Sequence, residues 1–541
     1  MKEGINDKQT GLQEDCGQYE ESGRPFAEEA SVNTASNNKR IAKNTLLLYF
    51  RMGVTLVVSL YTCRVVLDVL GFEDYGTYNV VGGVVLMFTS ISGVLSSAIS
   101  RFLSFEIGAG NQDRLRKVFS TSLQIQWGMV LAMIVLMEVV GVWFLNAKLN
   151  IPLHRMEAAN WVLQCSIFTF ALNLLGLPYL AAIMSHERMN AYAYISILEV
   201  LLKLVAVFVL SAAACDKLKV WAVMLMLISL VVFLLYRGYG RRNFLECRGR
   251  RVFDRALLKE ITGFSGWNFI GASSAVLRDQ GVNILLNLFY GTAVNAARAA
   301  SMQVSVAISG FSSNIMAALN PQITKAYASG NREYMMTLIR QGSRFSFYLL
   351  LFFSLPVLIE TPMVLDLFLK DVPEHTVLFV RLILISVMME SISAPLITAM
   401  LATGNIRNYQ IVVGGLQLLN FPLSYVLLYW GFFPEVTVVV SIVCSVFSFL
   451  ARLFMLRGMI GLQSGAFFTK VFLRVWKVAL LSAVLPYLLY VWMDGGIGRL
   501  LLVCLASVFS TVGMIYYVGC DLSDRMYLKD KLEGLKKKWR K

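Results

Sequence analysis

The chain alternates long apolar runs with short polar segments from about residue 44 to about residue 519. Val80 to Ile99, Leu123 to Leu145 and Leu500 to Val518 are near-continuous apolar runs without a period of two. Each can cross the hydrocarbon core of a bilayer as a helix, which takes about 20 residues. A transmembrane β-barrel would instead need alternating strands of about ten residues. The pattern therefore predicts an all-α polytopic membrane protein with about 14 transmembrane helices.

The predicted spans form two lobes of about six helices each and a C-terminal pair. The first group lies near 44–67, 77–100, 121–145, 159–184, 191–214 and 218–236. The second lies near 264–289, 294–319, 344–369, 376–402, 408–430 and 435–456, and the pair near 471–493 and 498–519. The expected domains are a polar, disordered cytoplasmic prefix (1–43), an N-terminal lobe (44–236), a basic cytoplasmic linker (237–263), a C-terminal lobe (264–456), the final spans (457–519) and a basic cytoplasmic tail (520–541).

The positive charge of the chain is concentrated on one side of this predicted topology. Alternate connections hold about 36 Lys and Arg on the side of the N-terminus and about 6 on the other, a bias typical of the cytoplasmic side. Both termini are then predicted to be cytoplasmic. Because the formal charge of +15 follows from this bias and suits anionic membrane lipids, we expect no nucleic-acid partner. Residues 1–40 lack an apolar core segment, so we expect no cleaved signal.

The two groups of spans resemble each other at an offset of about 220 residues. Gly110-Asn111 aligns with Gly330-Asn331, each following one long span and leading into another. Pro178 similarly aligns with Pro395, and Tyr192 with Tyr409. A single match of this kind arises readily by chance, but the matches and the equal number of spans together favour a duplication. Because six spans return the chain to its starting side, the repeat is parallel, and a central cavity is expected between the lobes.

Arginines inside the apolar spans are the candidate functional residues. A guanidinium near the bilayer midplane costs on the order of 3 kcal/mol, so it requires water, a partner or an anionic ligand. A helical period places polar residues on one stripe of span one, which includes Asn44, Arg51, Thr55 and Thr62. Such a stripe is expected to face protein or water rather than lipid.

Spans seven and eight carry similar stripes. Span seven offers Asn268, with Arg278 beside Asp279 and Asn283, and span eight offers Arg298 with a row of serines at 305, 309 and 312. We predict that Arg51, Arg278, Arg298, Asn268 and Arg64 bind substrate. For Arg278 the alternative is an ion pair with Asp279 or a snorkelling side chain, and for Arg64 a structural role near Asp68 is favoured.

Several functional classes find no support in the sequence. The eight cysteines form no C-x-x-C pair and the three histidines lie far apart, so we expect free thiols and no metal site. The i, i+4 spacing of Glu199 and Lys203 predicts a structural ion pair. No phosphate-binding Gly-rich loop with its lysine is present, which argues against ATP hydrolysis. We therefore expect a transporter without a cofactor rather than an enzyme.

The stretch from Arg64 to Asn79, with Gly71 and Tyr75-Gly76, resembles the first loop of bacterial polysaccharide exporters of the Wzx flippase type. Ser100-Arg101-Phe102 and the proline-ended fourth span also resemble this family, which belongs to the multidrug/oligosaccharidyl-lipid/polysaccharide (MOP) exporter superfamily. The resemblance implies a bacterial inner-membrane protein that moves an undecaprenyl-pyrophosphate-linked oligosaccharide, a unit of O-antigen, capsule or exopolysaccharide, to the outer leaflet. It further implies cavity arginines that hold the anionic headgroup and glycan polymerase machinery as a partner.

Two other functions stay open at this point. A cation-coupled drug or metabolite exporter of the same superfamily would be expected to expose carboxylates in its cavity rather than guanidinium groups. A membrane-embedded glycan-assembly enzyme is a further alternative, although the predicted extracytoplasmic loops are short. The sequence does not identify the glycan, or choose between a proton, sodium and the membrane potential as the energy source.

Overall fold

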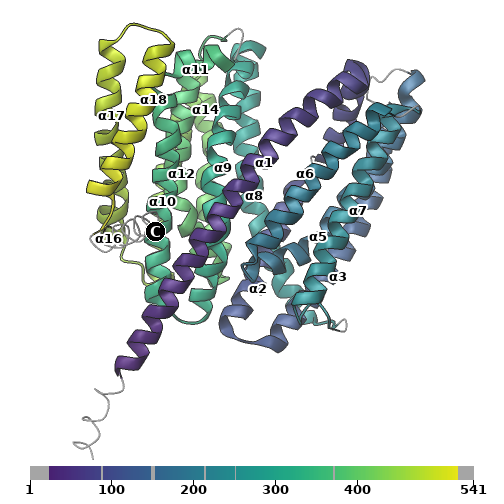
Figure 1. Ribbon diagram of the computed structural model, residues 1–541, viewed down its shortest axis with the longest axis horizontal. Coiled ribbons are helices and arrows are strands. Elements are labelled where there is room, and N and C mark those ends of the chain that lie inside the picture. Colours follow the sequence, from purple (N-terminus) through teal and green to yellow (C-terminus); the bar gives the residue numbers. More distant parts are fainter. Residues whose placement is uncertain are drawn as a thin grey trace, which may run out of the picture.

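The computed structural model describes residues 23–86, 89–147, 153–212, 215–249, 252–368, 372–521 and 525. Within these ranges every regular element is a helix, which confirms the predicted fold class (Figure 1). The N-terminal half contains α1 (Gly23–Leu86), α2 (Thr89–Ala109), α3 (Gln112–Leu136), a π-helical turn (Met137–Gly141), α4 (Val142–Ala147), a 3₁₀ turn (Leu153–Arg155), α5 (Met156–Ser185), α6 (Met189–Ala212) and α7 (Lys217–Asn243).

The remaining helices follow the non-helical residues 244–249 and 252–254. They are α8 (Arg255–Tyr290), α9 (Thr292–Ala328), α10 (Arg332–Ile359), α11 (Thr361–Phe368), α12 (Thr376–Thr403), α13 (Arg407–Leu418), α14 (Asn420–Tyr429), α15 (Val436–Ile460), α16 (Ser464–Phe467), α17 (Arg474–Trp492) and α18 (Ile497–Met514). Two π-helical segments, Phe468–Leu473 and Ile515–Gly519, adjoin α17 and α18.

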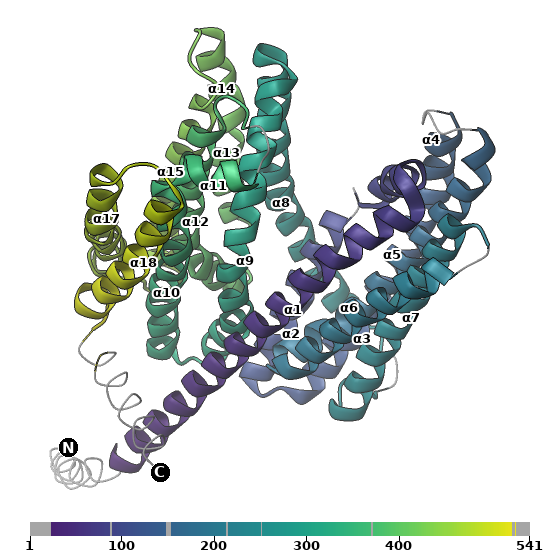
Figure 2. The same cartoon turned by 45° about the horizontal axis from the view of Figure 1, so that its top comes forward.

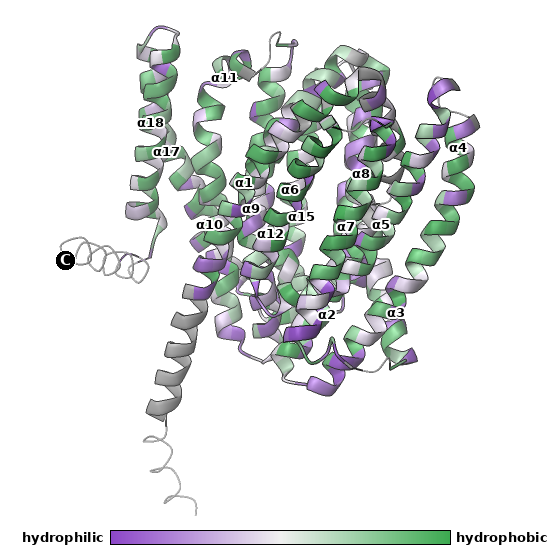
Figure 3. Ribbon diagram, turned by 45° about the vertical axis from the view of Figure 1, so that its right-hand side comes forward, coloured by the Kyte–Doolittle hydropathy of each residue, from purple (hydrophilic) through white to green (hydrophobic). Residues whose placement is uncertain are grey.

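Twelve helices in the described part of the chain are long and apolar enough to cross a membrane, so the chain is a multi-pass membrane protein. Hydrophobic residues run along the helices, and hydrophilic residues gather towards their ends (Figure 3). The two other predicted spans, 77–100 and 264–289, correspond to the end of α1 with α2 and to α8. Helix α8 differs from the twelve because it carries several polar and charged residues within its length.

The helices form two lobes that contact each other (Figures 1 and 2). In the N-terminal lobe α5 packs on α7 and α2, and α1 packs on α6. In the C-terminal lobe α12 packs on α9, α10 and α15, and α8 packs on α13. Helices α17 and α18 pack on each other and against α10. This arrangement is the predicted pair of lobes with an additional C-terminal helix pair.

Helix α1 is longer than the predicted first span. It begins at Gly23, so residues 23–43 belong to a helix where the sequence predicts a disordered prefix, and residues 1–22 lie outside the described residues. Residues 27–30, Ala-Glu-Glu-Ala, are good helix formers, which allows the apolar span to extend backwards. At Gly71 the backbone takes φ 77° and ψ 169°, which only glycine adopts readily, and the helix is kinked there.

The internal repeat has a structural counterpart in the two lobes. Asn111 accepts a hydrogen bond from the backbone N–H of Arg114 at 3.0 Å and caps α3, and Asn331 caps α10 through Tyr334 at 3.1 Å. The preceding glycines, Gly110 and Gly330, have φ values of 71° and 75°. Pro178 and Pro395 lie inside α5 and α12, the fourth span of each lobe. Equivalent sequence positions therefore have the same structural role in both lobes.

The lobes meet at one end of the molecule, which carries the turns at 110–111, 186–188, 244–249 and 329–331. We call it the basic end. There α2 packs against α9 and α8. The approach of α2 to α9 is so close that a Cβ atom on Gly108 would lie 2.6 Å from the backbone Cα of Lys325. At the other end of the molecule, α8 and α14 diverge from α4 and α5 (Figure 2).

Charged contacts attach the C-terminal helix pair at both ends. Arg499 donates to the fully buried Glu360 at 2.7 Å. At the basic end Arg344 donates to Asp521 at 2.7 Å, and Arg474 pairs with the same carboxylate. Burial alone would raise the pKa of Asp521, but the hydrogen bonds from Arg474 and Arg344 outweigh it and lower the pKa. The pair is therefore held to the C-terminal lobe by ion pairs as well as by apolar packing.

Replacing Gly108 tests the close approach of the lobes. Gly108→Ala would place a methyl group against the α9 backbone, so we expect a loss of about 1–3 kcal/mol in the free energy of unfolding. Gly128→Ala in α3 is the matched control, because a Cβ there meets nothing within 4 Å. Thermal unfolding of the two variants in detergent should show a lower midpoint for Gly108→Ala only. Equal midpoints would show that α2 and α9 are not in close contact.

Candidate functional site

Arg51 on α1 lies where the two lobes meet. Its Nη1 donates to the hydroxyl of Tyr192 on α6 at 2.8 Å, and its Nη2 donates to Oδ1 of Asn314 on α9 at 3.3 Å. The guanidinium carbon also lies 4.7 Å from the centroid of the Tyr192 ring, a cation–π distance. Arg51 thus joins the N-terminal lobe to the C-terminal lobe through two neutral partners.

The guanidinium of Arg51 has hydrogen-bonding capacity that the protein does not use. Its Nε is buried without a hydrogen-bond partner, as is Oγ1 of Thr55 one turn further along α1. No carboxylate of the described chain forms an ion pair with Arg51. Burying a charge costs much free energy unless it is paired and hydrogen-bonded. The geometry therefore leaves a cation between the lobes that an anionic ligand would stabilise.

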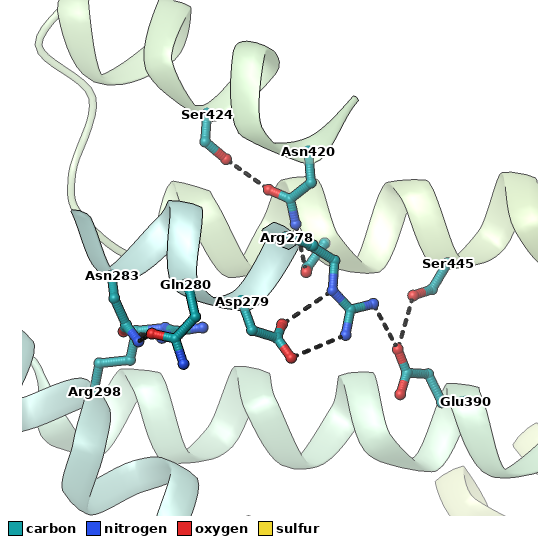
Figure 4. A network of polar contacts seen from close by, with 10 residues as sticks. Arg278, Asp279, Gln280, Asn283, Arg298, Glu390, Asn420, Ser424 and Ser445 are labelled. Carbon is teal, nitrogen blue, oxygen red and sulfur yellow. Dashed lines mark hydrogen bonds and ion pairs between the residues drawn. The ribbon is translucent and has the colours of Figure 1, made fainter. Parts of the chain in front are cut away.

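Arg278 has the environment that the sequence offered as the alternative. Its Nε lies 3.0 Å from Asp279, and its Nη1 lies 3.2 Å from Glu390 on α12. Figure 4 shows the guanidinium between the two carboxylates, with Ser445 of α15 donating to Glu390 at 3.5 Å. Two carboxylates therefore compensate the charge of Arg278, which distinguishes it from Arg51, and its role in substrate binding stays a prediction.

Arg298 lies near the start of α9, with 7% of its surface exposed. Its Nη1 donates to Oδ1 of Asn283 on α8, and its Nε is buried without a partner. Asn283 in turn donates to Gln280 at 3.2 Å. This group lies beside the Arg278–Asp279 pair in Figure 4, so Arg298 and Arg278 belong to one polar region of α8 and α9. Arg51 has its polar contacts elsewhere.

Two other predicted site residues contribute less. The Asn268 side chain accepts a long hydrogen bond, 3.5 Å, from Gln410 of α13 within the C-terminal lobe. Arg64 belongs to the backbone of α1, but its side chain lies outside the described residues. Of the four predicted residues whose side chains are described, Arg278 and Arg298 share one polar region, and Arg51 and Asn268 have their polar contacts elsewhere.

Glu187 is an interlobe residue that the sequence analysis missed. Its carboxylate is buried, with a side chain only 1% exposed, and accepts from Lys325 of α9 at 2.6 Å, from Arg40 at 2.9 Å and from Gln322. Glu187 also holds a positive φ of 58°, which is uncommon outside glycine. A strained, fully buried carboxylate that reaches across the lobe boundary indicates a latch at the basic end.

Arg101 on α2 forms a second link between the lobes. It donates to the backbone carbonyls of Leu401 at 3.2 Å and Ala402 at 2.9 Å, at the end of α12. Its guanidinium also lies 5.4 Å from the ring centroid of Phe264 on α8. The arginine satisfies carbonyls at a helix C-terminus, where a cation is favourable. In the sequence, Arg101 stood out only as part of the Ser100-Arg101-Phe102 segment that resembles the exporter family.

The polar contacts between the lobes lie on one side of the molecule. Among the described residues they use the halves of helices nearest the basic end, and Arg51 lies at the limit of this zone. They link Tyr49 to the Phe311 carbonyl, Arg51 to Asn314, Arg101 to Leu401 and Ala402, Arg114 to Glu260, and Glu187 to Gln322 and Lys325. The structure is therefore closed at the basic end.

One predicted ion pair is confirmed, and the described cysteines and histidines have defined surroundings. Lys203 and Glu199 form the expected i, i+4 ion pair at 2.7 Å. The cysteines of the described chain for which a state is assigned, including Cys165 and Cys444, are free. His186 and His375 each lie against a glutamate, Glu246 and Glu435 respectively, at the two ends of the molecule. No group of three or more potential metal ligands occurs among the described side chains.

Comparison with solved structures shows that the fold is similar to that of transporters of the MOP superfamily. An outward-facing multidrug resistance MATE family transporter of the MOP superfamily matches with a TM-score of 0.67 and 13% identity, over 78% of this chain and 96% of that one. A MOP superfamily transporter from Pyrococcus furiosus, described as having a binding pocket of reversed polarity, matches with a TM-score of 0.64 and 13% identity, over 78% and 96% of the two chains. At these identities the likeness concerns the fold.

Sequence comparison finds one distant relative. The uncharacterized membrane protein EpsK of Bacillus subtilis is 21% identical over 301 residues, which are 55% of this chain and 59% of that protein. The chain thus matches less than two thirds of the length of this relative. A search against protein-family models found no match.

Glu187→Gln tests the latch at the basic end. Loss of the charge weakens the contacts with Lys325 and Arg40, and we expect the closed state to lose about 1.5–3 kcal/mol. Phe105→Cys with Tyr327→Cys would report closure, because these rings face each other across the lobes at 6.3 Å. A short bifunctional thiol reagent should link this pair less in Glu187→Gln. The control is Glu157→Gln, which alters an exposed ion pair within the N-terminal lobe. Unchanged linking would contradict the latch.

Proposed function

We propose that the protein is an alternating-access transporter that moves a lipid-linked oligosaccharide with an anionic pyrophosphate headgroup from one leaflet to the other. The proposal rests on the environment of Arg51, which lies between the two lobes of a MOP-type fold. Its polar partners are neutral, and they come from both lobes. Its planar guanidinium matches phosphate oxygens in a bidentate geometry. The headgroup would accept the hydrogen bonds of the Arg51 guanidinium that Tyr192 and Asn314 leave unused.

One-sided contact between the lobes supports alternating access. Rocking of two lobes related by a parallel repeat exposes the same site to each side in turn. By the positive-inside rule the basic end faces the cytoplasm. The structure then corresponds to a state closed towards the cytoplasm, and Glu187 and Arg101 stabilise that closure. Opening towards the cytoplasm would break these contacts, and Arg51 would receive its ligand there.

The lipid-linked substrate suits this architecture for a physical reason. A polyprenyl tail can stay in the bilayer, while only the pyrophosphate and the sugars pass between the lobes. Loading and release both have to occur, so a single arginine with neutral partners is better suited than a dense cationic cluster. The substrate would be a unit of a bacterial surface glycan at the inner membrane, in keeping with the resemblance of residues 64–79 to polysaccharide exporters.

A cation-coupled multidrug or metabolite exporter is the second candidate. The MATE family transporters among the structural neighbours favour it, and Glu390 and Asp279 supply carboxylates in the C-terminal lobe. An organic cation would, however, be repelled by the uncompensated charge of Arg51. The sign of charge between the lobes therefore favours an anionic passenger.

Substitution of Arg51 tests the proposed function. In lipid nanodiscs, Arg51→Gln should weaken binding of a polyprenyl-pyrophosphate-linked oligosaccharide by about 10- to 100-fold, the effect of losing a hydrogen bond to a charged group. Arg51→Lys should recover part of the affinity, because it restores the charge without the planar fork. The control is Arg116→Gln, a half-exposed arginine at the basic end.

The same variants separate the two candidate functions. The drug-exporter alternative predicts that Arg51→Gln binds an organic cation such as ethidium at least as well as the wild type and that neither form binds the lipid-linked glycan. Equal glycan affinity in the wild type and Arg51→Gln would remove Arg51 from the proposed site.

A further inference from the structure

The C-terminal lobe contains a partly open cavity of about 350 Å³ that is lined by both polar and apolar side chains. It lies between α8, α9, α10, α12, α13 and α15. Its polar lining residues include Arg278, Ser309, Ser313, Glu390, Gln417 and Arg452. The headgroup site at Arg51 does not include this cavity, but α9 borders both: Ser313 lines the cavity, and the next residue, Asn314, accepts from Arg51.

Arg452 is a buried cation in this cavity. It is 5% exposed, and its Nε donates to the hydroxyl of Tyr409 at 3.4 Å. Among the described residues no carboxylate forms an ion pair with it. Tyr409 is the repeat counterpart of Tyr192, the partner of Arg51, so each lobe contains an arginine with a tyrosine at the equivalent position. The guanidinium can donate to oxygen atoms of a ligand.

Glu390 provides an acceptor in the same cavity. Its Oε1 receives the hydrogen bonds from Arg278 at 3.2 Å and Ser445 at 3.5 Å. Its Oε2 has no partner in the described part of the chain, and 43% of the side chain is exposed. Arg278 holds the carboxylate in place, so that an acceptor oxygen is available to a ligand (Figure 4).

The remaining polar groups can accept as well as donate. Ser309 donates to the Ser305 carbonyl at 2.6 Å, and Ser313 donates to the Ser309 carbonyl at 3.1 Å, which leaves both hydroxyl oxygens as acceptors. The Gln417 amide offers two donors and one acceptor. Ser445, which donates to Glu390, and Arg452 are seven residues apart on α15, a rise of about 10 Å along that helix.

We propose that this cavity binds a sugar unit of the transported glycan. Sugar hydroxyls both donate and accept, so they match a cavity that presents a carboxylate, a guanidinium, serine hydroxyls and an amide together. An apolar ligand would leave these groups unpaired. The inference rests on the proposed function: the pyrophosphate lies at Arg51, and the first sugars extend past α9 into the C-terminal lobe.

Two probes distinguish this subsite from the headgroup site. Binding of sugar-free polyprenyl pyrophosphate and of the same lipid carrying an oligosaccharide is measured for the full-length protein in nanodiscs. Glu390→Gln removes the charged acceptor, so it should weaken the glycan-bearing probe about tenfold and leave the sugar-free probe unchanged. Gln417→Leu should act in the same direction and leaves the Arg278 ion pairs intact. Glu199→Gln is the matched control in the N-terminal lobe.

Each outcome decides one part of the proposal. Selective loss of the glycan-bearing probe supports the sugar subsite. Equal loss of both probes, or no loss of either, overturns the subsite while the headgroup site stands. If the folded wild-type protein binds neither probe, the proposed function fails and the subsite fails with it. If Glu390→Gln does not yield folded protein, Gln417→Leu decides by the same criteria.

Discussion

The free energy cost of a guanidinium between two membrane-embedded lobes is the constraint on which this account depends. Arg51 contacts Tyr192 in one lobe and Asn314 in the other, and neither partner carries a compensating charge. In a low-dielectric setting a neutral hydrogen bond recovers only part of the hydration that the ion has lost. Such a position gains free energy when an anion binds, and for this reason the proposed headgroup site is centred on Arg51.

The lobes are closed on one side of the molecule, and this one-sided closure determines from which side a ligand can reach Arg51. Arg51 lies at the limit of the contact zone, with Glu187, Arg101 and the α2–α9 packing between it and the basic end. These contacts are a buried ion pair, hydrogen bonds to helix carbonyls and a glycine contact. Packed interfaces of this kind switch between discrete arrangements rather than deform continuously. The proposed alternating access would then require few specialised residues.

The sequence was sufficient to predict the helices, the lobes and the repeat, because these depend on apolar run length and on local turn chemistry. Gly110-Asn111 and Gly330-Asn331 signal helix boundaries directly, since the cap and the positive φ are local properties. The partners of the arginines depend instead on packing between segments far apart in the chain. Adjacency in the sequence suggested Asp279 as a partner of Arg278, and that ion pair forms, but the sequence could not reveal Glu390, 112 residues away.

The same limit explains Glu187 and Arg452. Glu187 lies in a short polar turn where solvent exposure is the usual expectation, and only the docking of α9 buries it. Arg452 sits near the end of a span, where snorkelling is the ordinary reading, and its burial depends on α13. Helix α1 shows the reverse case: a polar prefix forms part of a helix because the apolar span that follows provides the nucleus.

The most direct measurement is a cryo-EM structure of the protein in nanodiscs with a bound polyprenyl-pyrophosphate-linked oligosaccharide. The account predicts phosphate density within hydrogen-bonding distance of the Arg51 guanidinium, between α1, α6 and α9. Phosphate density away from the space between the lobes, with Arg51 still bonded only to Tyr192 and Asn314, would contradict it.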